Sequence, residues 1–327
     1  MLLAATAGAW QFAIPCESAE RTRRIAIVVT TGDPEAIQPA ASPLWTVFFQ
    51  ELQRLGYAEG QNLIVERYSG EGRTDSYSEL AKKVVASKPE LIVCFTTRLA
   101  FEFKAATTTI PIVTSASVSV DTGLVPSLAR PGGNITGVDY AGAEFYAKQL
   151  QLLRQVIPAA TRIAYLMPRA VWESPTLLGS VKEAAKQAGI SLVPALLESP
   201  IQEPEYRRVF AALAQDRVDG LLVGDSAENL AQSSLLPELA AQTRLPTFYP
   251  FRVFVENGGL MSLGPDRAEL RRRMASNVAE ILNGAKPGDI PFYQATRFEL
   301  VINLKTARAL GLEMPGALLA GADELIE

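Results

Sequence analysis

The feature that most constrains the fold is a series of short, uninterrupted apolar runs, each followed by a segment with helical spacing. Residues 25–29 are Ile-Ala-Ile-Val-Val, and residues 91–95 are Leu-Ile-Val-Cys-Phe. Such runs suit strands that are buried on both faces of a parallel sheet, because a solvated face would require alternating polar residues. The ranges that we predict as strands are 24–30, 62–68, 90–95, 110–114, 162–167, 191–196 and 220–223.

Helical segments separate these strands. Ser76 with Glu79 three residues later has the pattern of a capping box, and Ser174-Pro175 has the pattern of a helix start that ends near Gly189. The other ranges that we predict as helices are 43–55, 99–107, 144–156, 205–214 and 228–242.

The alternation falls into two sets. A loop region with Pro126, Pro131 and Gly132-Gly133 interrupts it, and a second set begins after a junction near residues 137–144. Because single helices connect consecutive strands, right-handed crossovers should place helices on both faces of each sheet. The predicted fold class is therefore α/β, with two doubly wound parallel-sheet lobes.

Composition excludes several functions. The chain has no histidine, which removes Ser-His-Asp, Cys-His and zinc hydrolase mechanisms. With 31 Lys and Arg against 35 Asp and Glu, the formal charge of −4 provides no positive field for nucleic acid. Cys94 lies inside an apolar run, where a thiol acts as a small buried hydrophobe. We expect no nucleic-acid partner and no redox chemistry.

Sequence motifs that are typical of enzymes are incomplete or absent. Residues 224–228, Gly-Asp-Ser-Ala-Glu, approach a nucleophile elbow, but Glu228 replaces the final glycine and no histidine can activate Ser226. No dinucleotide-binding or Walker A sequence occurs, and residues 131–134 are interpreted as a turn. The run Arg271-Arg272-Arg273 is interpreted as the solvated face of a helix. We expect no catalytic residues, no metal and no cofactor.

The N-terminus is typical of an export signal. Between Leu2 and Pro15 the only polar side chains are Thr6 and Gln11, and the stretch is too short to span a bilayer. We predict a signal peptide at 1–19 and a periplasmic protein; a disordered or core-packed tail is the alternative. Cys16 suggests a lipid anchor, but Pro15 before it disfavours that interpretation.

A ligand site is expected beyond the carboxyl ends of the strands, where loops and helix N-termini converge. Hydroxyls in the first set of strands could hold a carboxylate, and Asp225 in the second could receive an ammonium group. The competing roles are helix capping for the hydroxyls and for Asp225, and core packing for the aromatic residues. The candidate ligand-binding residues are Thr30, Thr31, Thr96, Thr97, Arg98, Ser115, Arg169, Trp172, Asp225, Ser226 and Tyr249. The set favours a small carboxylate-bearing solute with an apolar or aromatic body, such as an amino acid, over a neutral sugar.

Five segments of the sequence match the pattern of a known family. They are residues 128–137 (Leu-Ala-Arg-Pro-Gly-Gly-Asn-Ile-Thr-Gly), 258–262 (Gly-Gly-Leu-Met-Ser) with Gly264, 283–287 (Asn-Gly-Ala-Lys-Pro), 298–307 (Phe-Glu-Leu-Val-Ile-Asn-Leu-Lys-Thr-Ala) and 322–327 (Ala-Asp-Glu-Leu-Ile-Glu). Together they resemble the ABC-transporter substrate-binding protein family that includes tryptophan- and tyrosine-binding members. Arg98 and Leu263 depart from the pattern of many relatives, so the pocket chemistry can differ from theirs.

The resemblance implies a type I periplasmic-binding-protein fold, with two lobes joined by a multi-strand hinge. It also implies capture of a small solute for an inner-membrane permease with a cytoplasmic ATPase, by a protein that we expect to be monomeric. We assign residues 24–138 and 252–297 to lobe one, and residues 139–251 and 298–327 to lobe two.

Three alternatives stay open at this point. The effector domain of a transcriptional regulator shares this fold but requires a helix-turn-helix before the first strand, where only 24 residues precede Ile25. An enzyme on the same scaffold would be limited to carboxylate chemistry. A ligand-sensing module could feed a receptor rather than a transporter.

Overall fold

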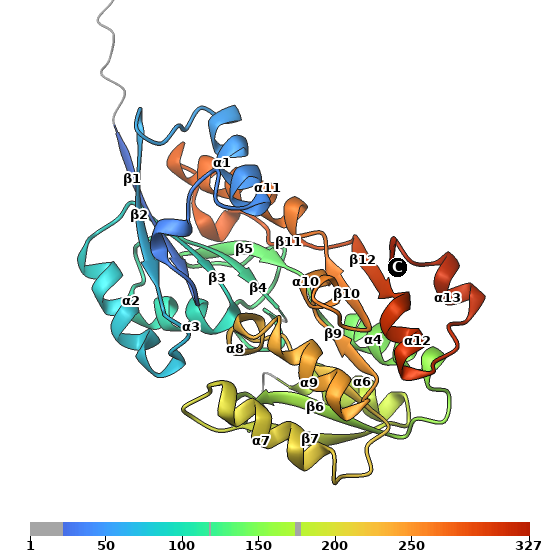
Figure 1. Ribbon diagram of the computed structural model, residues 1–327. Helices are drawn as coiled ribbons and strands as arrows, with labels where there is room; N and C mark the ends of the chain where they lie inside the picture. The colour runs from blue at the N-terminus through green and yellow to red at the C-terminus, as the bar shows by residue number, and fades with distance from the viewer. Residues whose placement is uncertain (1–21, 118, 174–177) are drawn as a thin grey trace, which may run out of the picture.

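The computed structural model describes residues 22–117, 119–173 and 178–327, and it forms two lobes (Figure 1). The signal peptide expected at 1–19 and the helix start expected at Ser174-Pro175 lie outside the described residues.

Lobe one is built on a six-stranded sheet in the order β11-β5-β4-β3-β1-β2. Every pairing in it is parallel. The apolar runs occupy the centre: Ile27 of β1 lies beside Val93 of β3, and both are fully buried. The strands are β1 (Arg23–Val29), β2 (Leu63–Ser69), β3 (Leu91–Phe95), β4 (Ile112–Ala116), β5 (Ile135–Asp139) and β11 (Tyr293–Gln294).

Helices cover both faces of this sheet. One face carries α1 (Pro43–Arg54) and α11 (Arg267–Leu282), which pack on each other, and the other carries α2 (Tyr77–Ala86) and α3 (Thr97–Ala106). The short 3₁₀ helices η1 (Pro34–Ala36), η2 (Thr74–Ser76) and η3 (Pro287–Asp289) lie in the connections.

The starts of two helices differ in how they are capped. α1 begins as its sequence indicates, because the Ser42 side chain accepts a hydrogen bond from the Trp45 amide at 3.3 Å. The capping box predicted for α2 is wrong: Ser76 Oγ donates to the Arg73 carbonyl at 2.8 Å, and the chain enters α2 through η2 instead.

Lobe two is built on a seven-stranded sheet in the order β13-β12-β10-β9-β8-β6-β7. Its pairings are parallel except that β12 runs antiparallel to β10. The strands are β6 (Arg162–Pro168), β7 (Ser191–Leu197), β8 (Gly220–Val223), β9 (Thr247–Tyr249), β10 (Met261–Pro265), β12 (Phe298–Asn303) and β13 (Glu324–Ile326).

This sheet is also covered on both faces, by α4 (Ala143–Val156) with α6 (Gly179–Gln187) and by α7 (Glu203–Leu213) with α9 (Leu235–Thr243). Shorter helices follow strand ends, namely α5 (Arg169–Trp172), α8 (Ala227–Ala231), α10 (Arg252–Glu256) and α12 (Leu304–Leu310), and α13 (Gly316–Ala320) lies between α12 and β13. Of the helices in the described ranges, none combines the length and the apolar character that a membrane crossing needs.

The chain passes between the lobes three times: after β5, between β10 and α11, and between β11 and β12. The second passage corrects the expected lobe boundary. We assigned residues 252–265 to lobe one, but β10 pairs with β9 and β12, so this segment belongs to lobe two. The chain returns to lobe one only at α11, which packs against α1 and the first sheet.

Candidate ligand-binding site

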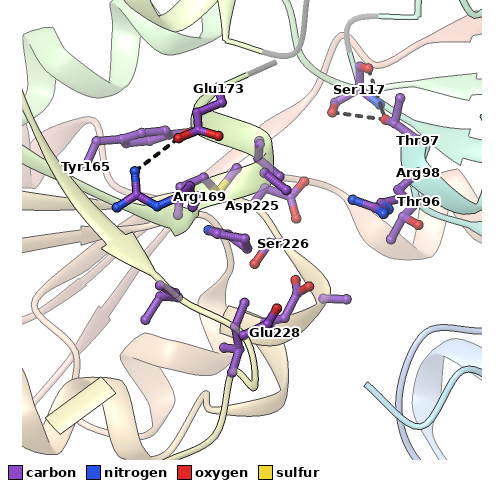
Figure 2. Close-up of a pocket in the computed structure, with 18 of the residues that line it drawn as sticks. Thr96, Thr97, Arg98, Ser117, Tyr165, Arg169, Glu173, Asp225, Ser226 and Glu228 are labelled. Carbon is purple, nitrogen blue, oxygen red and sulfur yellow. Dashed lines mark hydrogen bonds and ion pairs between the residues drawn. The ribbon is translucent and has the colours of Figure 1, made fainter. Parts of the chain in front are cut away.

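Two neighbouring cavities that share lining residues lie in the cleft between the lobes, at the carboxyl ends of the central strands. The large compartment has a volume of about 440 Å³ and the small compartment about 250 Å³. Figure 2 shows the large compartment, with Thr96, Thr97 and Arg98 of lobe one on one side and Asp225 and Ser226 of lobe two on the other. The residues that line both compartments, which we call the waist, are Thr96, Tyr140, Asp225, Ser226 and Ala227.

The lobe-one wall follows β3 and β4. Thr96 is the N-cap of α3, and its side chain accepts a hydrogen bond from the Leu99 amide at 3.3 Å. The buried Thr97 hydroxyl oxygen accepts from the Ser117 amide at 2.9 Å, which ties α3 to the loop after β4. These two hydroxyls therefore have structural partners as well as positions on the cavity wall.

The remaining lobe-one candidates divide between the compartments. Thr30, Thr31 and Ser115 line the small compartment, whereas Arg98 is half-buried and lines the large one. All six candidates that lobe one contributes are therefore on the cavity walls.

Asp225 provides the carboxylate of the waist. It follows β8 and Gly224, where a Cβ would lie only 2.4 Å from the Met167 sulfur, so glycine allows the close packing of β8 against β6. Its Oδ2 atom accepts a hydrogen bond from the Tyr140 hydroxyl at 2.6 Å. Desolvation raises the pKa of Asp225, while the hydrogen bond from Tyr140 and the charge of Arg267 oppose that rise.

Capping of α8 is performed by the neighbouring residue. The Ser226 side chain accepts from the Asn229 amide at 3.1 Å, and the Asn229 side chain donates to the carbonyls of Leu166 and Gly224 at 3.1 and 2.8 Å. The capping role that competed for Asp225 is therefore filled by Ser226. The Asp225 carboxylate is left facing the cleft.

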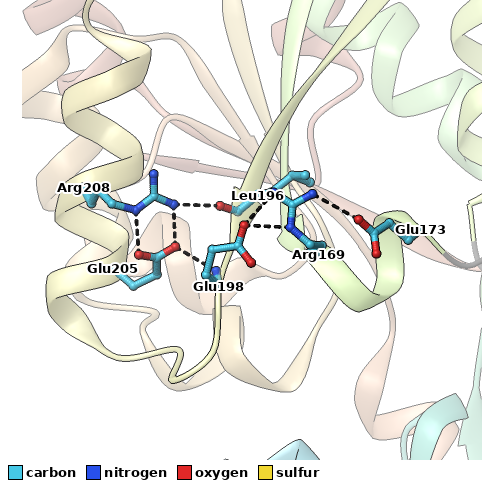
Figure 3. A network of polar contacts seen from close by, with 6 residues as sticks. All are labelled: Arg169, Glu173, Leu196, Glu198, Glu205 and Arg208. Carbon is cyan, nitrogen blue, oxygen red and sulfur yellow. Dashed lines mark hydrogen bonds and ion pairs between the residues drawn. The ribbon is translucent and has the colours of Figure 1, made fainter.

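Arg169 lines the large compartment but is already paired. Its guanidinium lies 2.6 Å from Glu198 and 3.1 Å from Glu173, and it is exposed (Figure 3). The hydrogen bonds that Arg169 donates to these two carboxylates raise the pKa of Arg169. A ligand anion at this position would compete with both.

Two aromatic candidates, Tyr249 and Trp172, line neither compartment. Tyr249 is fully buried in the lobe-two core and stacks on Phe254, with ring centroids 5.1 Å apart. Trp172 is half-buried against the other core cluster of lobe two, and Lys182 Nζ lies 4.7 Å from its ring centroid. Their strand-end positions are as expected, but their side chains point into the helical layers.

The aromatic walls of the cleft come from other residues. The large compartment is lined by Tyr140, Tyr146, Tyr165 and Met167, and the small compartment by Trp45, Phe95 and Phe251. Phe95 and Tyr140 directly follow the buried parts of β3 and β5. They could therefore have been predicted in the same way as Thr96, because ligands bind beyond the carboxyl ends of parallel strands. Nothing local in the sequence indicates that Trp45 of α1 lies at the cleft.

The position of the Arg271 side chain also differs from the prediction. Its guanidinium lines the small compartment, 3.6 Å from the ring centroid of Phe95 and 4.7 Å from that of Trp45. The expectation that the whole run 271–273 is solvated is therefore wrong at its first residue. Arg267, one helical turn earlier, lines the same compartment.

The described residues contain no group of three or more His, Cys, Asp or Glu side chains placed to hold a metal ion. The cleft instead combines hydroxyls, a carboxylate, guanidiniums and aromatic faces, a set that can orient a small polar solute with an apolar body. Two lobes around such a cleft define a type I periplasmic-binding-protein fold.

Comparison with known proteins gives the family. Residues 39–326 match the family model of the ABC transporter substrate binding proteins, and the chain belongs to that family. The tyrosine-binding protein of Clostridioides difficile (strain R20291) is 27% identical over 270 residues, which cover 81% of this chain and 76% of that protein.

Two solved structures have the same fold. A conserved domain protein from Vibrio cholerae O1 biovar El Tor superposes with a TM-score of 0.82 at 26% identity, covering 93% of this chain and 100% of that one. The ABC domain in complex with L-Trp from Streptococcus pneumonia gives a TM-score of 0.78 at 23% identity, again with 93% and 100% covered.

Proposed function

We propose that this protein is the extracytoplasmic solute receptor of an ABC importer, and that its solute is a carboxylate-bearing molecule with an apolar or aromatic body, an amino acid. The receptor acts as a monomer without a cofactor in the periplasm. It delivers its solute to an inner-membrane permease that a cytoplasmic ATPase drives.

The observation that carries this proposal is the waist of the cleft, where the Asp225 carboxylate of lobe two faces the Thr96 side of lobe one. An ammonium group at Asp225 would replace part of the hydration that the carboxylate loses in the cleft. A solute in contact with both lobes stabilises the closed arrangement, because an open cleft can offer it only one wall.

The body of the solute fits the large compartment. Tyr146, Tyr165 and Met167 supply flat and adaptable apolar surface there, and Leu197 and Ile201 extend it. A compartment of about 440 Å³ has the size of an ordinary small-molecule pocket. The names of two relatives, one a tyrosine-binding protein and one solved with L-Trp, support an aromatic amino acid.

Calorimetry on the purified chain tests the proposal, with the twenty L-amino acids and neutral sugars as solutes. We expect one or a few amino acids to bind and to raise thermal stability, by about 2.7 kcal/mol at 100 times Kd. The Asp225→Ala variant should lose affinity for that amino acid, whereas Asp216→Ala, at an exposed aspartate of the same lobe outside both compartments, should not. Tight binding of a neutral sugar, or equal affinity of wild type and Asp225→Ala, contradicts the proposal.

A further inference from the structure

The three consecutive arginines of α11 have different surroundings. Arg272 and Arg273 both pair with Glu269, at 3.1 and 2.8 Å, and Arg273 also lies 4.6 Å from the ring centroid of Tyr293. Arg271 points to the opposite side, into the small compartment. Within the part of the chain that the structure describes, it has no ion pair, and its buried Nη1 atom has no hydrogen-bond partner.

Aromatic rings hold the Arg271 guanidinium in place without using its N–H donors. The guanidinium carbon lies 3.6 Å from the ring centroid of Phe95 and 4.7 Å from that of Trp45, which fixes its position by cation–π attraction. Desolvation and the nearby charge of Arg267 lower the pKa of Arg271. A planar cation kept in a cleft with unused donors matches a carboxylate, which can accept two parallel hydrogen bonds.

The balance of charge distinguishes the two compartments. Besides the shared Asp225, the described residues that line the large compartment include the carboxylates of Glu173, Glu198 and Glu228 and two guanidiniums, those of Arg98 and Arg169. The small compartment is lined by Arg267 and Arg271, and among the described residues Asp225 is the one carboxylate that lines it. An anionic group is therefore favoured in the small compartment and disfavoured in the large one.

Arg267 and Asp225 partly compensate each other. The charge of Asp225 opposes the lowering of the Arg267 pKa by desolvation, and the charge of Arg267 in turn lowers the pKa of Asp225. Arg267 also lies over the Phe251 ring, 5.1 Å from its centroid. Arg271 is therefore the cation of the small compartment that has no described counter-charge.

We propose that Arg271 is the carboxylate-binding residue of the cleft. The carboxylate of the solute lies in the small compartment against the guanidinium, its amino group lies at the waist beside Asp225, and its body extends into the large compartment. This inference rests on the proposed function and adds to it the place of each chemical group. It moves the carboxylate from the Thr96 and Thr97 hydroxyls, which already accept hydrogen bonds from backbone amides, to α11.

Matched aromatic probes test the placement. They are L-tyrosine with tyramine and 3-(4-hydroxyphenyl)propionate, and L-tryptophan with tryptamine and indole-3-propionate. On the wild-type chain, we expect the amino acid and its deaminated acid to bind and the amine to bind at least about 100-fold more weakly. An amine that binds as tightly as its acid overturns the inference.

Variants localise the effect. Arg271→Gln should weaken binding of the amino acid roughly 100-fold, and Arg271→Lys should fall between it and wild type, because lysine keeps the charge but not the planar fork. Arg272→Gln, one residue along the same helix and paired with Glu269, is the control and should leave Kd unchanged. Thermal melting verifies that each variant is folded.

The possible results separate the inference from the proposed function. If an amino acid binds the wild type and Arg271→Gln binds it within about threefold, Arg271 is not the carboxylate receptor, although the proposed function stands. If none of the six probes binds the wild type, the proposed aromatic solute and the inference fail together. Where Arg271→Gln does not fold, Arg271→Lys decides: it should weaken binding of the amino acid at least about tenfold, and a Kd within about threefold of wild type overturns the inference.

Discussion

Removal of the Tyr140 hydroxyl should destabilise the folded protein by a measurable amount, because it breaks one short hydrogen bond to a carboxylate. The hydroxyl donates to Asp225 Oδ2 at 2.6 Å in the waist of the cleft. Hydrogen bonds to charged groups contribute about 1.5–3 kcal/mol net, and more is lost when the acceptor stays desolvated. We therefore expect Tyr140→Phe to lower the free energy of unfolding by roughly 1.5–3 kcal/mol.

A double-mutant cycle isolates this interaction. Urea denaturation of wild type, Tyr140→Phe, Asp225→Ala and the double variant should give a coupling energy of about 1.5–3 kcal/mol. Tyr146→Phe is the matched control, because Tyr146 lines the same compartment and the structure shows no hydrogen bond from its hydroxyl among the described residues. A coupling energy below about 0.5 kcal/mol would refute the reasoning.

The same variant should change the dependence of stability on pH. Desolvation raises the pKa of Asp225 above its ordinary value of 3.8, so the folded state holds this proton more firmly than the unfolded state. The cost of the desolvated carboxylate is fully present at neutral pH, and it is relieved as pH falls through the folded-state pKa toward 3.8. Because the Tyr140 hydrogen bond lowers that pKa, the relief should begin at a higher pH in Tyr140→Phe. Identical pH profiles for the two proteins would argue against this coupling.

Three further predictions concern side chains around the cleft. Arg169→Gln should change the Kd for a bound amino acid by less than about threefold in calorimetry, since Glu198 already pairs with the guanidinium; a loss of 100-fold would mean that Arg169 holds the solute. Tyr249→Phe should leave Kd unchanged, because the ring lies in the core, and a tenfold loss would place Tyr249 at the solute after all. Ser180→Ala removes a 2.6 Å hydrogen bond to Asp121 that joins the lobes, so small-angle X-ray scattering of the unliganded chain should show a larger radius of gyration, and an unchanged radius would count against this contact.

The buried apolar runs made most of the fold predictable from the sequence. The sheet to which β10 belongs was not predictable in this way. Residues 261–265 form a mostly apolar segment that could extend either sheet, and its place is decided by antiparallel pairing with β12, whose paired residues lie 33 to 41 positions further along the chain. Such pairing leaves no local signal, because it joins residues that are distant in the sequence. The two other crossings lie beside Gly137 and Gln294, near the ends of lobe-one strands.

The residues that line the cleft were predictable from the sequence where backbone position alone places them there. Asp225 and Thr96 follow buried strands in a parallel sheet, and the topology brings such ends to the cleft. Backbone position does not determine where a side chain points. Tyr249, for example, lies at a strand end, but its side chain is buried in the core. Arg271 differs from its neighbours only because α11 packs so that this residue faces β3, and a triplet of arginines carries no sign of that orientation.

A crystal structure of the chain grown with the amino acid that binds most tightly in calorimetry would examine the central claim. We predict that the solute lies in the interlobe cleft, within hydrogen-bonding distance of Asp225 from lobe two and in contact with the lobe-one wall at Thr96. A solute that contacts one lobe alone, or that lies outside the two compartments, would contradict the assignment of this cleft as the site of capture.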